Sequence, residues 1–237
     1  KTMPNYSGMW TLQAQMQAAG QATWPNLPVT LGLWGWGTGN AGVLGQNNQT
    51  DYSSPVQVGS DSTWSKVSSS GYTTTSIKSN GTIWSWGANN RGQLGQNDRV
   101  YRSSPVQIGA LTNWSLVATG TTGGDATTAA IKTDGTLWSW GTNSRGQLGL
   151  NITAGVYRSS PVQVGALTDW AKIYPGKATF LAIKTDGTLW TWGLNGDGQL
   201  GQNNVIYRSS PVQIGALTTW ASISAGGTSA AIKTDGT

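Results

Sequence analysis

The sequence predicts an all-β fold made of repeated sheets, and three observations support this. A Leu/Ile-Trp-x-Trp-Gly motif recurs about every 50 residues, with its first tryptophan at Trp34, Trp84, Trp138 and Trp190. Each copy continues with Leu-Gly, Ser-Ser-Pro-Val-Gln and a single tryptophan, and it closes on Ile-Lys before a turn. The 237 residues include 14 Trp and 34 Gly but one Phe, which is unusual for a globular domain.

Each copy is expected to form about four short strands. The clearest hairpin signal is Asp134-Gly135, which lies between residues 130–133 and 136–140, two runs rich in β-forming residues. Asp-Gly, or Asn-Gly at Asn80, suits a type I′ turn, which needs positive φ at both central residues. The Pro-Val-Gln and Trp-x-x-Val/Ile runs supply two further strands. Four strands per copy is the content of a β-propeller blade.

A long motif in these repeats identifies a family resemblance. Trp-Gly-x-Asn-x-x-Gly-Gln-Leu-Gly begins at Trp86, Trp140 and Trp192, and Pro-Val and Lys-Thr-Asp-Gly accompany it. Residues 31–237 therefore resemble the regulator of chromosome condensation family of propellers. The resemblance implies a ring of about seven blades. The family includes a nucleotide-exchange factor for a small GTPase and many interaction modules. The histidine common before its closing strand is absent here, and no functional residue is carried over.

The chain divides into an N-terminal segment and four repeats. The segment is residues 1–30, and the repeats are about 31–82, 83–136, 137–188 and 189–237. The last repeat lacks a Trp-x-Trp strand, and the first carries an extra one. Two arrangements follow. The four blades either close a ring in which one terminus completes the other's blade, or form part of the larger ring that the resemblance favours.

The N-terminal segment differs from the repeats. Residues 10–19 favour a short helix. Residues 7–25 resemble a segment of tailed-phage structural proteins, which implies attachment to a neighbouring protein. The alternative is a helix that covers one end of the propeller. Four side chains are candidates for attachment: Trp10, Leu12, Met16 and Trp24.

The composition limits the chemistry. The chain contains no His and no Cys, and all nine of its acidic residues are Asp. It therefore lacks a side chain that titrates near neutrality, a thiol nucleophile and the ligands of a Cys/His zinc site. We expect no catalytic residue, no cofactor and no metal. The apolar runs are only a few residues long, so we expect no insertion into a membrane.

Three apparent motifs have simpler explanations. Gly37–Gly42 matches G-x-G-x-x-G, but aligned repeats show that it is a variant of the repeat's turn. Asn195–Gly198 resembles a calcium loop without its acidic ligand set. Asp134, Asp186 and Asp235 invite a paired-carboxylate interpretation as a glycosidase acid and base, yet they occupy equivalent turns on successive blades.

Repeated Tyr-Arg pairs form the candidate ligand or partner surface. Repetition would place them as an arc that could bind anionic glycans or nucleic acid through charge and stacking. The alternative is a solvated loop whose arginine covers an aromatic ring, and a net charge of +5 is a weak field. Most tryptophans are expected in the core. The arc residues are Tyr101, Arg102, Tyr157, Arg158, Tyr207 and Arg208.

These observations predict a non-enzymatic structural or adhesive protein. The main hypothesis is a tailed-phage virion component such as a fibre, spike or decoration protein, present in several copies in the extracellular particle. Its expected partners are other virion proteins and a host-surface glycan or protein. The alternative is a cytoplasmic protein-interaction propeller such as a small-GTPase regulator. A glycan-degrading enzyme is a third hypothesis.

Overall fold

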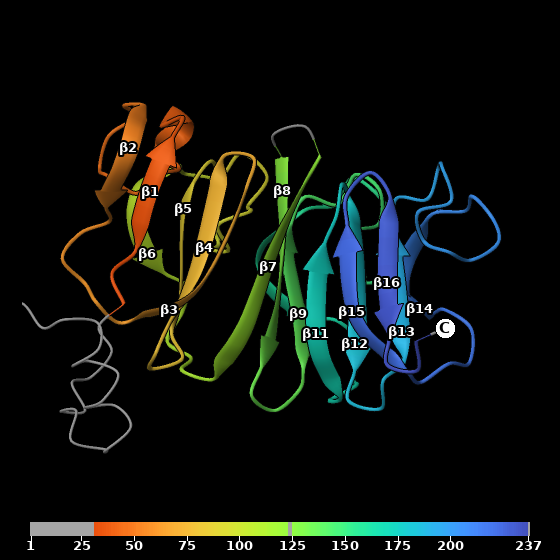
Figure 1. Ribbon diagram of the computed structural model, residues 1–237. Coiled ribbons are helices and arrows are strands. Elements are labelled where there is room, and N and C mark those ends of the chain that lie inside the picture. The colour runs from red at the N-terminus through yellow and green to blue at the C-terminus, as the bar shows by residue number, and fades with distance from the viewer. Residues whose placement is uncertain (1–30, 123–124, 237) are drawn as a thin grey trace, which may run out of the picture. The chain divides into compact units, whose positions relative to one another are not determined.

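The structure is a computed structural model that describes residues 31–122 and 125–236 (Figure 1). These residues form sixteen β-strands. Within them, the single helical element is a 3-10 turn, η1 (Asn40–Gly42). The helix expected at residues 10–19, with Trp10, Leu12, Met16 and Trp24, lies outside the described residues.

Three complete four-stranded antiparallel sheets form the centre of the fold, which confirms the expected blades. The first blade consists of β3 (Trp64–Ser70), β4 (Thr73–Lys78), β5 (Ile83–Gly87) and β6 (Arg102–Gln107). The second consists of β7 (Trp114–Thr122), β8 (Asp125–Lys132), β9 (Leu137–Gly141) and β10 (Arg158–Gln163). The third consists of β11 (Trp170–Pro175), β12 (Thr179–Lys184), β13 (Leu189–Gly193) and β14 (Arg208–Gln213).

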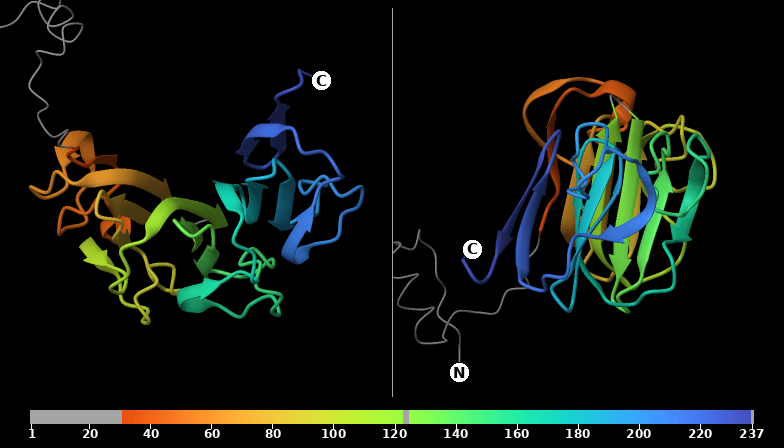
Figure 2. Two further views of the ribbon diagram at one scale, coloured as in Figure 1. Left: turned by 90° about the horizontal axis from the view of Figure 1, so that it is seen from below. Right: turned by 90° about the vertical axis from the view of Figure 1, so that its right-hand side faces the viewer.

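Two half-blades flank the complete blades. One pairs β1 (Trp34–Gly37) with β2 (Tyr52–Gln57), and the other pairs β15 (Trp220–Ala225) with β16 (Ser229–Lys233). The two half-blades do not pair with each other, and Figure 2 shows them at opposite ends of an arc of sheets. Residues 31–236 therefore do not form the closed four-bladed ring that was one of the two expected arrangements.

The first strands of successive blades lie side by side along this arc. β3 packs on β7, β7 on β11 and β11 on β15. The Ser68 hydroxyl accepts a hydrogen bond of 2.9 Å from the Thr119 amide, and residues Thr121 and Lys177 form a parallel bridge. The arginine-led strands β6, β10 and β14 lie at the opposite edge of each sheet. This arrangement fixes which residues share a surface.

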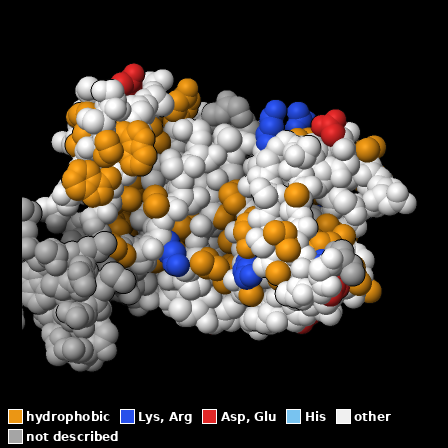
Figure 3. All heavy atoms as spheres, in the orientation of Figure 1, with side chains coloured by type: hydrophobic (Ala, Val, Ile, Leu, Met, Phe, Trp, Pro, Cys, Tyr) orange, Lys and Arg blue, Asp and Glu red, His pale blue; other side chains and the backbone are white. Residues whose placement is uncertain are grey.

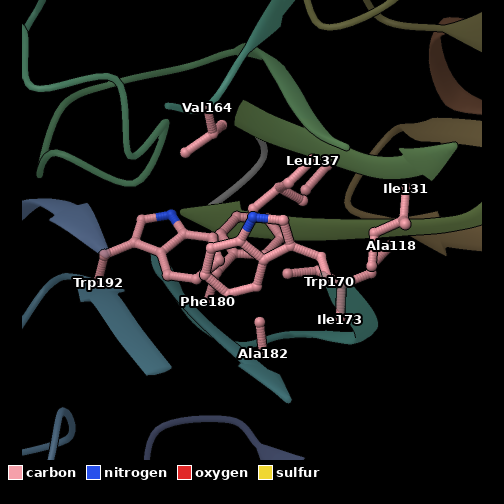
Figure 4. Packing of buried hydrophobic residues seen from close by; sticks show 10 residues of the cluster. Ala118, Ile131, Leu137, Val164, Trp170, Ile173, Phe180, Ala182 and Trp192 are labelled. Atoms are coloured by element: carbon pink, nitrogen blue, oxygen red, sulfur yellow. The ribbon is translucent and has the colours of Figure 1, made fainter. Parts of the chain in front are cut away.

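The hydrophobic core extends across blade boundaries. Figure 4 shows Leu137 of the second blade beside Phe180 and Trp192 of the third. The Trp192 ring stacks on Phe180, with ring centroids 5.8 Å apart. In the first blade, Thr74 occupies the position of Phe180 and donates a hydrogen bond to the Val43 carbonyl instead. The expectation that most tryptophans are core residues is confirmed in the complete blades.

Each complete blade is fastened to the preceding repeat by an indole hydrogen bond. Trp140 Nε1 donates to the Gln93 carbonyl at 3.1 Å, and Trp86 and Trp192 make equivalent bonds of 2.8 and 3.0 Å. Gly95 lies against the same ring, because a Cβ there would be 2.8 Å from Trp140 Nε1. The Trp-x-Trp and Gln-Leu-Gly parts of the repeat are thus two sides of one contact.

The Asp-Gly and Asn-Gly turns differ from the expected type I′ turn. Among the described residues, the glycine has positive φ (77° at Gly135) but the preceding aspartate does not. The Gly135 amide donates to the Lys132 carbonyl, and the Lys132 amide donates to the Thr136 carbonyl, as in a three-residue loop with a glycine bulge. Asp134 Oδ1 accepts hydrogen bonds from the Thr136 amide and hydroxyl at 2.9 and 2.6 Å. This local network makes the longer turn favourable.

A substitution at Gly135 tests whether these turns also need space for the next blade. An added Cβ would clash with the Thr168 carbonyl, and φ is positive, so we expect Gly135→Ala to cost about 3 kcal/mol of stability. Gly165 also has positive φ but nothing within 4 Å of its Cβ position, so Gly165→Ala should cost about 1 kcal/mol. Thermal unfolding followed by tryptophan fluorescence compares the two. Equal losses would show that backbone strain alone matters.

Candidate partner-binding face

Each complete blade contains a lysine held between two indole rings. The Lys78 ammonium lies 4.7 Å from the centre of the Trp64 ring and 3.7 Å from that of Trp84. Lys132 and Lys184 lie 3.8 and 4.2 Å from the equivalent second rings. These distances are those of cation–π contacts, which strengthen as the cation is removed from water. The three clusters bind an internal cation, so they are structural rather than ligand sites.

The clusters differ in the acid that faces the lysine. Lys78 forms an ion pair with Asp61 at 2.5 Å, and this pair lowers the pKa of Asp61 to about 2, with help from Thr63. Lys184 lies 3.4 Å from Asp169. In the second blade, Asn113 occupies the position that Asp169 occupies in the third, directly before the blade's first tryptophan. The Asn113 Oδ1 atom is buried and accepts no hydrogen bond. Burial lowers the pKa of Lys132, partly opposed by Asp134.

The turn aspartates are poorly suited to acid catalysis. Hydrogen bonds from the Thr136 side chain and backbone lower the pKa of Asp134, and Thr188 does the same for Asp186. A glycosidase acid needs a raised pKa. The interpretation of these aspartates as turn residues therefore accounts for their contacts.

The two loop motifs also take part in the turns of the repeat. β1 ends at Gly37 and is followed by the 3-10 turn η1, so the G-x-G-x-x-G match is a turn variant, as expected. The Asn195 side chain bonds the Leu200 amide and the carbonyls of Asn204 and Ile206. Among the described residues, no group of three potential metal ligands occurs and no helix is long and apolar enough to cross a membrane.

The arginines gather at one end of the sheets. We call this end the loop face; it carries the hairpins between first and second strands and the connections between third and fourth strands. The opposite end, with the Asp-Gly turns, is the turn face. Figure 3 shows Lys and Arg side chains at the upper edge of the sheets, which belongs to the loop face. All six arginines lie in its connections or at the following strand starts: Arg91, Arg99, Arg102, Arg145, Arg158 and Arg208.

The predicted Tyr-Arg pairs lie on this face, but the arginines of the three pairs have different partners. Arg102 is neutralised by Asp98 at 2.7 Å. Arg158 donates to the Tyr157 carbonyl, and Arg208 Nε has no hydrogen-bond acceptor. In the described part of the chain, neither Arg158 nor Arg208 forms an ion pair. The last two arginines are therefore the uncompensated charges. Tyr101 and Tyr207 are exposed, and Tyr157 is half-buried.

Two arginines outside the predicted set cover the tyrosines. The Arg91 guanidinium lies 4.7 Å from the Tyr157 ring centre, and that of Arg145 lies 5.8 Å from Tyr207. Each contact joins one repeat to the next. The predicted alternative, an arginine that covers an aromatic ring, is thus present with different arginines. Arg91 and Arg145 occupy the same position of the repeat motif, and this could have indicated a shared role. Their contacts with tyrosines of the following repeat were not apparent from the sequence.

The repeats match a family model for the regulator of chromosome condensation (RCC1) repeat at residues 32–77, 80–127, 134–182 and 186–232. The chain belongs to the RCC1-repeat family. The Danio rerio Protein RCC2 homolog is 40% identical over 76 residues, which are 31% of this chain and 15% of that protein. The mitochondrial RCC1 domain-containing protein RUG3 of Arabidopsis thaliana is 33% identical over 111 residues, 46% of this chain and 25% of that protein.

A solved RCC1-repeat structure shows the same fold. Prp20p of Saccharomyces cerevisiae superposes with a TM-score of 0.71 and 18% identity. The match covers 84% of this chain and 51% of Prp20p. The chain thus spans a quarter or less of these two curated relatives, and about half of the solved chain.

The expectation of a tailed-phage virion component is wrong. The RCC1-repeat match and the eukaryotic relatives overturn it, and with it the expected virion partners, host-surface ligand and several copies in a particle. Nothing in these matches supports a phage-like segment at residues 7–25. A composition rich in Gly, Ser, Thr and Asn also suits the loops of an RCC1-repeat propeller. The composition could therefore not distinguish a phage structural protein from an interaction propeller.

Asparagine 113 allows a test of the lysine clusters. We expect Asn113→Asp to stabilise the protein by about 0.5–1 kcal/mol, because the new carboxylate would face Lys132 as Asp169 faces Lys184. Lys132 would lower the pKa of this carboxylate below its unfolded value of about 3.9. The gain is therefore present above about pH 4 and disappears as the pH falls through the folded-state pKa.

The reverse substitution, Asp169→Asn, is the matched control. It should lower the thermal midpoint at neutral pH and have little effect at low pH. If Asn113→Asp leaves the thermal midpoint unchanged while Asp169→Asn lowers it, a carboxylate at position 113 does not interact with Lys132 as Asp169 does with Lys184.

Proposed function

We propose that this RCC1-repeat chain is a non-catalytic interaction propeller inside the cell, and that its loop face binds an acidic protein surface. The observation that carries this proposal is the placement of all six arginines on the loop face, with Arg158 and Arg208 outside any ion pair in residues 31–122 and 125–236. Charge complementarity of this kind steers a partner and sets its orientation.

The turn face differs in its balance of charge. Its aspartates lie beside the lysines of the indole clusters, as in the pairs Asp61–Lys78 and Asp169–Lys184. These charges are compensated within the protein. An acidic partner would therefore gain more on the loop face than on the turn face.

A protein partner fits this surface better than a nucleic acid does. Single-stranded nucleic acids bind largely by stacking bases on open aromatic rings. Arg91 and Arg145 already lie over Tyr157 and Tyr207, so those rings are partly covered. Prp20p, which shares the fold, has binding properties toward Gsp1p and histones, and this supports a protein-binding role by analogy.

Regulation of a small GTPase is the narrower form of this proposal, and it rests on the family resemblance. It predicts that the chain accelerates release of a labelled nucleotide from a small GTPase. Acceleration would assign a regulatory role, and binding without acceleration would leave an interaction module.

Paired arginine substitutions test the loop face. We expect Arg158→Gln with Arg208→Gln to weaken binding of a fluorescently labelled polyglutamate peptide about tenfold, at roughly 0.7 kcal/mol for each of these half-buried charges. Fluorescence anisotropy at low salt measures this affinity. Added salt should reduce it, since exposed charges are screened.

The control removes the same net charge elsewhere. Lys66 and Lys172 are exposed on the first strands β3 and β11, away from the loop face. Lys66→Gln with Lys172→Gln should therefore change the peptide affinity by no more than about twofold. An equal loss in both pairs would mean that net charge alone attracts the peptide. Tighter binding of single-stranded DNA than of the peptide would point to a nucleic-acid partner instead.

A further inference from the structure

One loop position is held in the same way before the arginine-led strand of every complete blade. The asparagine of the Trp-Gly-x-Asn motif donates a side-chain hydrogen bond to the backbone carbonyl of this position. The bonded pairs are Asn89–Asp98 at 3.1 Å, Asn143–Thr153 at 3.2 Å and Asn195–Asn204 at 2.8 Å. We call Asp98, Thr153 and Asn204 the cap residues. Their backbones occupy equivalent places, so the blades differ here in the cap side chain.

The cap residue of the first blade neutralises the arginine that follows it. Asp98 Oδ1 accepts a hydrogen bond from the Val100 amide at 3.0 Å. Its other oxygen, Oδ2, pairs with the Arg102 guanidinium at 2.7 Å. An acidic partner would have to displace this carboxylate to reach Arg102.

The cap residue of the third blade makes the same backbone contact without a charge. Asn204 Oδ1 accepts from the Ile206 amide at 2.9 Å, and its Nδ2 donates to the Gln202 carbonyl at 2.8 Å. An amide nitrogen cannot accept from a guanidinium, and Arg208 forms no ion pair in the described part of the chain. Asp and Asn at the cap are therefore alternatives on one backbone arrangement, and they differ in whether the next arginine is neutralised.

The two arginines without an ion pair belong to adjacent blades whose loops touch. Thr153, the cap residue of the second blade, has no carboxylate, and Arg158 forms no ion pair within residues 31–122 and 125–236. Gly146, in a connection of the second blade, packs on the third, because a Cβ there would lie 3.0 Å from the Arg208 carbonyl oxygen. Arg158 and Arg208 therefore belong to one continuous part of the loop face.

Exposed apolar side chains accompany these arginines. Val156, Val205 and Ile206 are 42%, 62% and 58% exposed, in the residues just before the Tyr-Arg pairs. Apolar groups bordered by polar ones are typical of interaction surfaces. Val100 is also 58% exposed, beside the neutralised Arg102. The apolar groups are thus common to the three blades, and the available charge distinguishes the second and third.

We propose that the cap residue decides which blades bind an acidic partner, and that this partner is a protein segment combining acidic and apolar side chains. The inference rests on the proposed function of the loop face. The segment lies over the second and third blades, where its carboxylates pair with Arg158 and Arg208 and its apolar side chains cover Val156 and Ile206. The Asp98 carboxylate repels the same segment from the first blade.

Exchange of the cap residues tests this assignment. Asp98→Asn should release Arg102 and tighten binding of the labelled polyglutamate peptide about threefold. Asn204→Asp should neutralise Arg208 and weaken binding about threefold. Both variants should fold, because each new residue already occupies the cap position of another blade and accepts the same backbone hydrogen bond there.

Matched controls make the same charge changes on the turn face. Asn80 and Asp186 occupy the same turn position in two blades, and each accepts hydrogen bonds from the threonine two residues later. Asp186→Asn and Asn80→Asp should each change the peptide affinity by less than about 1.5-fold, because screening weakens charges far from the site. Changes as large as those of the cap variants would show that net charge alone attracts the peptide, and would overturn the assignment.

Chemical labelling measures the availability of each arginine without a partner. Phenylglyoxal modifies guanidinium groups, and mass spectrometry of proteolytic peptides locates the product. We expect Asp98→Asn to raise the labelling rate of Arg102 and Asn204→Asp to lower that of Arg208, with Arg158 as the internal standard. Bound polyglutamate should protect Arg158 and Arg208 more than Arg102 in the unsubstituted chain. Unchanged rates, or equal protection of all three arginines, would overturn the inference.

Two further peptides test the apolar part of the partner. They repeat Glu-Glu-Leu and Glu-Glu-Ser, so their charges match, and the leucine peptide should bind more tightly. Val156→Thr should weaken the leucine peptide about twofold, whereas Val100→Thr, on the neutralised blade, should have little effect. Equal affinity of the unsubstituted chain for both peptides would show that the partner needs no apolar side chains.

The cap assignment and the proposed function fail in different ways. If the paired substitution of Arg158 and Arg208 weakens peptide binding but the cap exchange does not alter it, the loop face binds acidic partners and the cap residues do not direct them. If the paired substitution itself leaves the affinity unchanged, the proposed function is wrong.

Discussion

The indole hydrogen bond between consecutive repeats is the contact on which the rest of the structure depends. Trp140 is fully buried, and its N–H reaches the Gln93 carbonyl of the preceding repeat. A buried N–H without an acceptor costs about 1–3 kcal/mol, so the ring is well placed only when that loop is present. Gly95 makes the approach possible, since any side chain there would meet the ring edge. Each blade is therefore completed by its neighbour.

This dependence explains why the ends of the arc differ from its centre. In a repeat protein, stability is approximately the sum of each unit and its contacts with adjacent units. The complete blades have neighbours on both sides, and their tryptophans and lysines are buried together. Trp36 has the same sequence context as Trp140, but among the described residues no loop of a preceding repeat packs against it, and it is exposed. The environment of a residue in this fold is set by adjacent repeats as much as by its own.

The sequence predicted most of the fold because the strand and turn signals recur at the same positions in every repeat. The recurring tryptophans and Asp-Gly pairs located the strands and turns. The turn type was not predicted, because Asp134 accepts two hydrogen bonds from Thr136 and thereby favours a three-residue loop. At the loop face, Arg158 and Arg208 were found from their own motif. Arg91 was missed, because its tyrosine lies in the following repeat and only the packing of adjacent blades brings the two together.

Repetition also explains how a modest net charge yields a polarised molecule. In a four-stranded antiparallel unit, each connection alternates between the two ends of the sheet, so a given repeat position always returns to the same face. Arginines in the third connection therefore accumulate on the loop face. Aspartates of the turns accumulate on the other, where the lysines between the indoles offset them. A net charge of +5 understates this separation, because Arg158 and Arg208, which form no ion pair among the described residues, lie at the other end of the strands from the Lys–Asp pairs.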